Sequence, residues 1–244
     1  MIIDTHCHID MYENPLEIAL ECESKGIITI GMTNLPSHFE MGQPHLVGFK
    51  KVRLALGMHP LFGESHEKEF SKFINNINKT SYIGEIGLDF SKEGIKTKAI
   101  QVNTFEKILT EVKNKKKVLS IHSRKAEKEV LGLLKENNID LAIFHWYCGP
   151  VSLVKEIQDA GYYFSINPSM INTKSGQEII KKISREKLLT ESDGPFIEFK
   201  GKTVKPSDIT HIHSHLATLW NINAENVENI IYANFKTILD SLAM

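Results

Sequence analysis

Residues 1–8 read MIIDTHCH and decide the fold: a short apolar run ends in His6-Cys7-His8. In an extended chain, side chains two positions apart point to the same side, so the imidazoles of His6 and His8 can reach one ion. Imidazole is the commonest metal ligand near neutral pH. The pattern predicts a buried strand that ends at a metal site. A lone His-x-His pair is weak evidence, so its weight depends on which residues end the later strands.

The rest of the chain alternates short apolar runs with amphipathic helical stretches. The runs lack polar alternation, as expected of strands buried on both faces, and lie at 2–5, 27–31, 52–57, 80–84, 118–121, 141–144, 162–166 and 188–191. Helices are expected at 15–20, 98–113, 126–136, 151–160, 176–183, 207–219 and 224–240. This alternation predicts an α/β fold, a TIM (β/α)8 barrel, with a doubly wound open sheet as the alternative.

Length and composition fit one domain of this kind. A barrel needs about 250 residues, and no repeat or linker interrupts the chain, so residues 1–244 are expected to form a single domain. No apolar run approaches the roughly 20 residues that span a bilayer, and the N-terminus lacks the basic segment of a signal peptide. We therefore expect a cytoplasmic enzyme without a membrane partner.

Charge and cysteine usage narrow the function further. The formal net charge is −1, so no basic field covers the surface, and local groups would have to attract a nucleic acid. The three cysteines show no Cys-x-x-Cys spacing and do not form a disulfide framework.

Good metal ligands stand at the ends of the later predicted strands. His59 comes after the third strand, Glu85 after the fourth, His122 after the fifth, His145 after the sixth and Asp193 after the eighth. In a parallel barrel, the carboxyl ends of the strands meet at one face, where active sites are built. If His59 is left aside and His6 and His8 are added, these residues bring four imidazoles and two carboxylates to that face. One catalytic zinc takes about three protein ligands and a water, so the set predicts two divalent ions that share a carboxylate.

Each of these residues also has an ordinary structural explanation. A single His after an apolar strand is more often satisfied or solvent-facing than a ligand. Glu85 alone could pair with a helix N-terminus or form a salt bridge, and Asp193 before Gly194-Pro195 suits a turn. Because six such residues all stand at strand ends, one shared metal centre explains them better than six independent structural roles. Paired ions suit the hydrolysis of phosphate esters or amides.

The same stretches resemble the motifs of the TatD family of metal-dependent DNases. The matches cover essentially the whole chain: 4–10 (DTHCHID), 57–60 (GMHP), 84–89 (GEIGLD), 121–124 (IHSR), 191–195 (ESDGP) and, around Asn234, 231–235 (IYANF). The resemblance implies a TIM barrel of the amidohydrolase superfamily. It also implies a 3′→5′ exonuclease or related phosphodiesterase that cleaves DNA, for which we expect single-stranded DNA as substrate. The implied cofactors are two divalent ions, Mg²⁺, Mn²⁺ or Zn²⁺.

The resemblance also implies roles for individual residues. His6, His8, Glu85 and Asp193 would hold one ion, and Glu85, His122 and His145 the other, with Glu85 as the bridging ligand. Asp193 would also accept the proton of the attacking water.

Two more residues are candidates for contact with the substrate. His59 is expected to contact the scissile phosphate, and the alternative is a loop histidine packed by Pro60. Arg124 is expected to clamp a phosphate oxygen, since guanidinium binds phosphate bidentately. The alternative for Arg124 is a surface salt bridge.

The substrate-binding shell departs from the family pattern. Leu61 stands where the family usually has a second His, the stretch 145–149 reads HWYCG, and the basic loop of the family is reduced to 199–206. These departures leave open an amidohydrolase-type hydrolase of a small molecule or modified nucleobase, or a binding component of a defence complex. Residues 12–15 (YENP) and 33–37 (TNLPS) resemble the TatD-type member of the Qat anti-phage systems. That resemblance implies an ATPase, a QueC-like protein and a small fourth component as partners.

Three other patterns have two explanations each. The histidines of 211–215 (HIHSH) could bind metal, but a solvated helix face is favoured because only His211 and His215 share a face. The lysines of 113–117 could touch DNA, but they end a helix on the face opposite the predicted site. Trp146 and Tyr147 could stack on a base or be buried in the barrel rim.

Overall fold

Eight parallel strands form the centre of the protein. The computed structural model describes residues 1–199 and 201–243. Hydrogen-bonded neighbours form two runs, β1-β2-β3 and β4 to β8 in chain order, and every pairing within them is parallel. The strands are β1 (Ile3–Cys7), β2 (Ile28–Gly31), β3 (Val52–Leu54), β4 (Tyr82–Gly87), β5 (Val118–His122), β6 (Ala142–His145), β7 (Tyr163–Ile166) and β8 (Leu188–Thr190).

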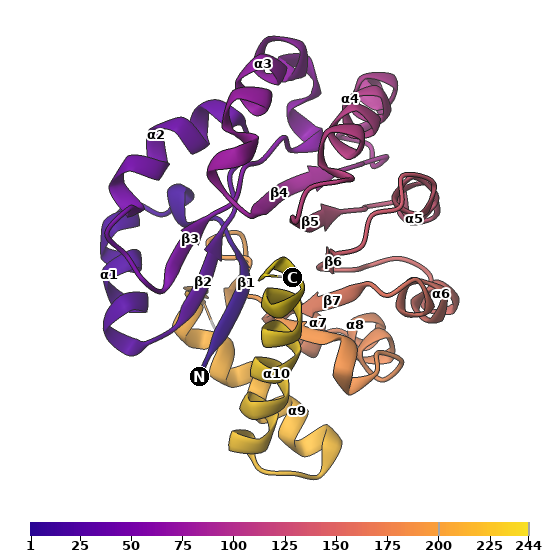
Figure 1. Cartoon of the computed structure of the whole chain (residues 1–244). Coiled ribbons are helices and arrows are strands. Elements are labelled where there is room, and N and C mark those ends of the chain that lie inside the picture. The colour runs from indigo at the N-terminus through magenta and orange to yellow at the C-terminus, as the bar shows by residue number, and fades with distance from the viewer. Residues whose placement is uncertain (200, 244) are drawn as a thin grey trace.

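The two runs join at both seams, so the sheet closes on itself (Figure 1). Leu56 pairs with Ile83 in parallel between β3 and β4. Between β8 and β1, the Asp193 amide donates to the His6 carbonyl at 2.9 Å, and the Thr190 hydroxyl donates to the Ile3 carbonyl at 2.6 Å. The predicted TIM barrel is confirmed, and the open sheet is excluded because its end strands would not meet.

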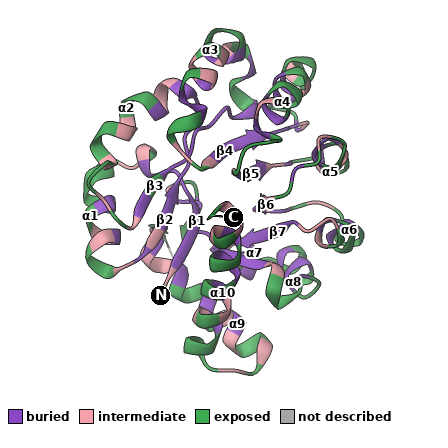
Figure 2. Cartoon of the chain, in the orientation of Figure 1, coloured by how far each residue is buried: buried purple, intermediate pink, exposed green. Residues whose placement is uncertain are grey.

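Helices surround the barrel and cover its strands. Figure 2 shows buried residues on the strands and on the inward faces of the helices, with exposed residues on the outward faces. The helices are α1 (Pro15–Lys25), α2 (Pro36–Leu46), α3 (His66–Asn76), α4 (Lys98–Val112), α5 (Glu127–Glu136), α6 (Val154–Asp159), α7 (Pro168–Asn172), α8 (Lys174–Ile180), α9 (Thr210–Trp220) and α10 (Ala224–Ala243). Among the described residues, no helix is long and apolar enough to cross a membrane.

Helices α2 and α3, and the short helix α7, were not expected from the sequence. Helix α3 buries His66, Glu69 and Asn76 beside Phe73, so polar residues occupy much of its inward face. Helix α2 contains Pro44, and its hydrophobic periodicity is weak. Weak periodicity explains why α2 was not expected, but the apolar residues of α3 do recur at helical spacing, and this signal was missed.

The segment after β8 contains a small hairpin. Strands β9 (Glu198–Phe199) and β10 (Lys202–Thr203) pair antiparallel within this segment. Lys200 of the predicted 199–206 loop lies outside the described residues. The Tyr12 hydroxyl donates to the Val204 carbonyl at 2.5 Å, which ties the hairpin to the turn after β1.

Helix α10 is joined to the barrel by the buried side chain of Asn234. Its amide donates to the carbonyls of Arg185 at 2.6 Å and Leu188 at 2.8 Å, where the chain enters β8. The family's C-terminal Asn motif therefore has a structural role in this chain.

We expect Asn234→Ala to destabilise the fold by about 1–3 kcal/mol, because two carbonyls lose their donor. Urea unfolding followed by circular dichroism measures the change. Asn229→Ala, on the exposed face of the same helix, is the control and should change stability by less than about 0.5 kcal/mol. Equal stability of the two variants would contradict this role for Asn234.

Candidate metal centre

The structure brings all six predicted metal ligands together at the carboxyl ends of the strands. His6 lies in β1, with His8 one residue beyond it, and Glu85 lies in β4. His122 and His145 are the last residues of β5 and β6, and Asp193 comes after β8. All are buried except His122, whose side chain is partly exposed.

One group of ligand atoms surrounds one oxygen of Glu85. The Nε2 atoms of His6 and His8 lie 3.2 Å apart. Oε2 of Glu85 is 3.5 Å from the former and 3.1 Å from the latter. Asp193 Oδ1 approaches the same two nitrogens at 3.5 Å and 3.8 Å. Two imidazoles and two carboxylates therefore point at one small volume.

A second group surrounds the other oxygen of Glu85. Oε1 lies 2.6 Å from His122 Nδ1 and 2.8 Å from His145 Nε2. His59 Nε2 is 3.3 Å from the same oxygen. The two oxygens of one carboxylate thus face different sets of histidines.

Near Glu85, the main chain is packed so closely that only glycine fits at position 57. A Cβ on Gly57 would lie 1.6 Å from the Thr33 carbonyl oxygen. That carbonyl accepts the amide hydrogen of Glu85 at 3.2 Å. The glycine of the 57–60 motif therefore lets the β3 end approach the segment that positions the central carboxylate.

Buried polar groups behind the ligands orient them. Ser120 Oγ lies 2.8 Å from His6 Nδ1, and Asp89 Oδ2 lies 2.8 Å from His122 Nε2. Asp4 Oδ1 accepts the amide hydrogens of His6 and Ser192, at 3.2 Å and 3.0 Å. Such contacts fix the ring orientation of a ligating imidazole.

These orienting groups were missed in the sequence. Asp4 and Asp89 stand inside matched motifs, but nothing in the sequence shows which ligand each one faces. Glu191 is a further case: it is fully buried, and it accepts the Trp146 amide hydrogen at 3.0 Å beside His145.

The charges of the centre are strongly coupled. Burial favours the neutral acid, yet the nearby imidazoles of His59 and His145 hold the pKa of Glu85 well below its usual range. Burial disfavours a charged His145, yet Glu85 and Glu191 raise its pKa well above the ordinary value. Burial raises the pKa of Asp193 and lowers that of His6. These groups therefore influence one another's charge, and buried carboxylate and imidazole groups are suitable ligands for divalent cations.

The contact from Asp89 gives a prediction about metal affinity. Asp89→Asn replaces one acceptor oxygen by an amide nitrogen, so either His122 Nε2 or the Ser91 amide loses its acceptor. We expect metal binding to weaken by about 10- to 100-fold, measured by calorimetric titration of chelated protein. Asp140→Asn, at an exposed position, is the control. Unchanged affinity in Asp89→Asn would contradict the orienting role.

A hydrogen bond to the His59 ring determines which of its two nitrogens carries the proton. Its Nδ1 accepts the amide hydrogen of Leu61 at 3.1 Å, so the neutral ring carries its proton on Nε2. Nε2 is the atom that faces Glu85. His59 therefore presents a hydrogen-bond donor to the centre, while the Leu61 side chain is 42% exposed beside it.

Arg124 lies at the mouth of the site in an exposed ion pair. Its Nη1 is 3.2 Å from Glu93 Oε2, and both side chains are more than half exposed. The surface salt bridge considered as the alternative is therefore present. Arg124 also lines a cavity of about 290 Å³ that includes His122, His145 and Trp146.

The other residues singled out in the sequence differ in how far they are exposed. His211 is exposed, as predicted for a solvated helix face, and its ring lies 4.9 Å from the Phe199 ring at an interplanar angle of 44°. His213 does not belong to that face: it lies on the inward face of α9 and is buried, and burial lowers its pKa to about 4. Tyr147 is buried and unavailable for stacking, whereas Trp146 is partly exposed.

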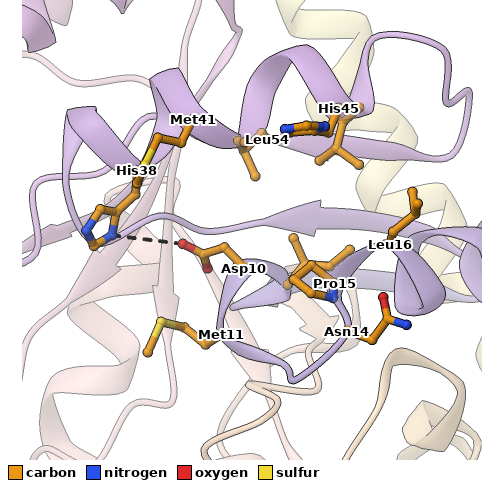
Figure 3. A pocket seen from close by; sticks show the side chains of 12 residues that line it. Asp10, Met11, Asn14, Pro15, Leu16, His38, Met41, His45 and Leu54 are labelled. Carbon is orange, nitrogen blue, oxygen red and sulfur yellow. Dashed lines mark ion pairs between the residues drawn. The ribbon is translucent and has the colours of Figure 1, made fainter.

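A second, more apolar groove of about 510 Å³ lies between α1 and α2 (Figure 3). Met41 and Leu16 line its walls, and both are more than half exposed. At one end, His38 Nδ1 lies 4.0 Å from Asp10 Oδ2. One end of the groove therefore lies at Asp10, which follows the candidate ligand His8 by two residues in the sequence.

Comparison with known proteins agrees with this geometry. The family model TatD related DNase matches residues 3–240. An uncharacterized metal-dependent hydrolase of Methanocaldococcus jannaschii is 26% identical over 244 residues, covering 95% of this chain and 94% of that protein. Deoxyribonuclease TATDN3 of Homo sapiens is 25% identical over 255 residues, covering 96% of this chain and 92% of that protein.

The fold is shared with a solved structure. YJJV, a TatD homolog from Escherichia coli K12, superposes with a TM-score of 0.87 at 21% identity, over 97% of each chain. The family model spans nearly the whole chain and includes every strand that carries a candidate ligand. The chain therefore belongs to the TatD-related DNase family.

Proposed function

We propose that this protein is a metal-dependent hydrolase that cleaves phosphodiester bonds in DNA, in the manner of a 3′→5′ exonuclease acting on single strands. The observation that carries the proposal is the position of Glu85, whose two oxygens face two separate groups of histidines. Paired ions held by a shared carboxylate suit hydrolysis of phosphate esters. Family membership and the deoxyribonuclease name of a relative support DNA as the substrate.

The proposed ion-binding residues are those of the two groups. His6, His8, Glu85 and Asp193 would hold one divalent ion, and Glu85, His122 and His145 the other, with Mg²⁺, Mn²⁺ and Zn²⁺ as candidates. Bound there, the ions would act as Lewis acids towards the phosphoryl group and would acidify a water.

The remaining chemistry belongs to side chains of this chain. We assign the proton of the attacking water to the Asp193 carboxylate, which lies beside the imidazoles of His6 and His8. His59 Nε2–H would donate to a phosphate oxygen, since its Nδ1 is already occupied. Arg124 would exchange the exposed Glu93 carboxylate for a phosphate oxygen.

An amidohydrolase-type reaction on a small molecule or modified nucleobase is the second candidate. It is favoured by Leu61, which places an exposed apolar side chain where the family usually has a second histidine. A third candidate, a binding component without activity, is disfavoured because all six proposed ligands are present in groups that could hold an ion.

Digestion of end-labelled DNA tests the proposal. The purified protein, loaded with Mn²⁺ or Mg²⁺, should shorten a 5′-labelled single strand in a ladder and should be inactive in EDTA. The same sample should be assayed with amide and deaminase substrates. Turnover of those substrates without DNA cleavage would favour the second candidate.

A partnership in a Qat defence system is a narrower proposal that rests on residues 12–15 and 33–37 alone. It expects the protein, acting as one domain in the cytoplasm, to copurify with the ATPase and the QueC-like protein when they are co-expressed. If the protein purifies without either partner, the proposed Qat partnership is contradicted. The proposed hydrolase activity does not depend on this result.

A further inference from the structure

We propose that Phe62 and Phe196 are stacking surfaces for nucleobases on two sides of the metal centre, so that the enzyme holds unpaired nucleotides by their bases. This inference rests on the proposed function and specifies how its substrate is recognised. Neither side chain was singled out in the sequence, because an apolar residue in a loop carries no signal there.

The two rings are exposed although they are large and apolar. Phe196 is 54% exposed and Phe62 is 38% exposed. Folding normally removes phenyl surface from water, and exposed apolar groups gathered at a polar cleft mark a binding site.

Both rings stand against histidines of the centre. The Phe196 and His8 rings lie 4.8 Å apart at an interplanar angle of 72°. The Phe62 and His59 rings lie 6.0 Å apart at 89°. Edge-to-face contact of this kind fixes an aromatic ring and leaves much of its remaining surface free.

The histidines behind the rings approach opposite oxygens of one carboxylate. His8 Nε2 lies 3.1 Å from Glu85 Oε2, and His59 Nε2 lies 3.3 Å from Glu85 Oε1. Phe196 comes from the segment after β8 and Phe62 from the turn after β3. The rings therefore bracket the place where a scissile phosphate would lie, and the nucleotides on either side of that phosphate would meet them.

Apart from the proposed ions and Arg124, charge contributes little to strand binding at this site. The net charge of the chain is −1, and Arg124 at the mouth is already paired with Glu93. Stacking does not depend on a basic surface and tolerates any base, because every base presents a π-face. A paired base within a duplex is covered by its neighbours, so stacking on protein selects unpaired ends.

The apolar groove between α1 and α2 is the competing place for a base (Figure 3). It adjoins the same region, since the His38 ring lies 6.4 Å from the Phe62 ring. Met41, which is 64% exposed and lines the groove, provides the matched control.

Binding without turnover tests the inference. The dissociation constant of chelated protein is measured by fluorescence anisotropy for a labelled single strand and for the same strand with abasic 3′ nucleotides. The wild-type protein should prefer the strand with bases. In Phe62→Ala and Phe196→Ala this preference should fall by roughly 5- to 100-fold, and Phe62→Trp and Phe196→Trp should restore it. Met41→Ala should keep the wild-type preference.

The outcomes separate this inference from the proposed function. Equal binding of both strands by the wild type, or an unchanged preference in the alanine variants, would overturn stacking. A loss in Met41→Ala as large as in the phenylalanine variants would overturn it in favour of the groove. Cleavage by metal-loaded wild type is scored separately: no cleavage, together with the expected binding pattern, would reject the phosphodiesterase and retain the base-binding surface.

Discussion

Replacing Glu85 by glutamine should lower kcat/KM on single-stranded DNA by about 10³-fold or more. The variant keeps the shape of the side chain but has one oxygen and no charge. Oε2 approaches His6 and His8, whereas Oε1 approaches His122 and His145. An amide nitrogen must face one of these two groups, so one group loses its shared ligand. Bound metal, measured by plasma mass spectrometry, should fall in parallel.

The control for this prediction is Glu106→Gln, at an exposed position on α4. It removes the same charge far from the barrel mouth and should leave both activity and metal content unchanged. Near-normal DNA cleavage by Glu85→Gln, or cleavage by either protein in EDTA, would contradict a centre built on the Glu85 bridge.

Asp193→Asn should reduce kcat by about 10²–10⁴-fold, the usual contribution of a positioned proton acceptor. Asp193 occupies a left-handed backbone position with φ of 46°, which aspartate tolerates, and its Oδ1 lies 3.5 Å from His6 Nε2. Asparagine fits the same backbone and the same volume, but it cannot accept the proton. KM should change much less than kcat, because the substrate contacts assigned to His59 and Arg124 remain.

Steady-state rates at saturating metal separate this loss from simple loss of ions. If high Mn²⁺ restores Asp193→Asn to within tenfold of wild type, Asp193 is a ligand without a role in proton transfer. Asp159→Asn, at an exposed position on α6, provides the matched control and should keep the wild-type kcat.

The barrel could be predicted from the sequence because its strands are buried on both faces. Each strand therefore appears as a continuous apolar run, and the ligands at the run ends converge once the strands are parallel. Helix α2 could not be predicted in this way, because its apolar residues are only weakly periodic and Pro44 stands inside it. The inward position of His213 depends on the packing of α9, which the local sequence does not encode.

The same distinction holds for the candidate site: the types of its residues could be read from the sequence, but the contacts between strands could not. Residue type and spacing indicate the candidate ligands, since imidazole and carboxylate have few other reasons to recur at strand ends. The contacts that orient them, such as Asp89 to His122, join different strands and become visible only in three dimensions. The exposed phenyl groups of Phe62 and Phe196 acquire a meaning only from the histidines behind them.

Titration of chelated protein with Mn²⁺, with DNA cleavage measured at each addition, tests the central claim most directly. The binuclear centre predicts that cleavage of a 5′-labelled single strand appears as the second equivalent binds and stops when EDTA is added. Full activity with one equivalent bound, or with none, would contradict it.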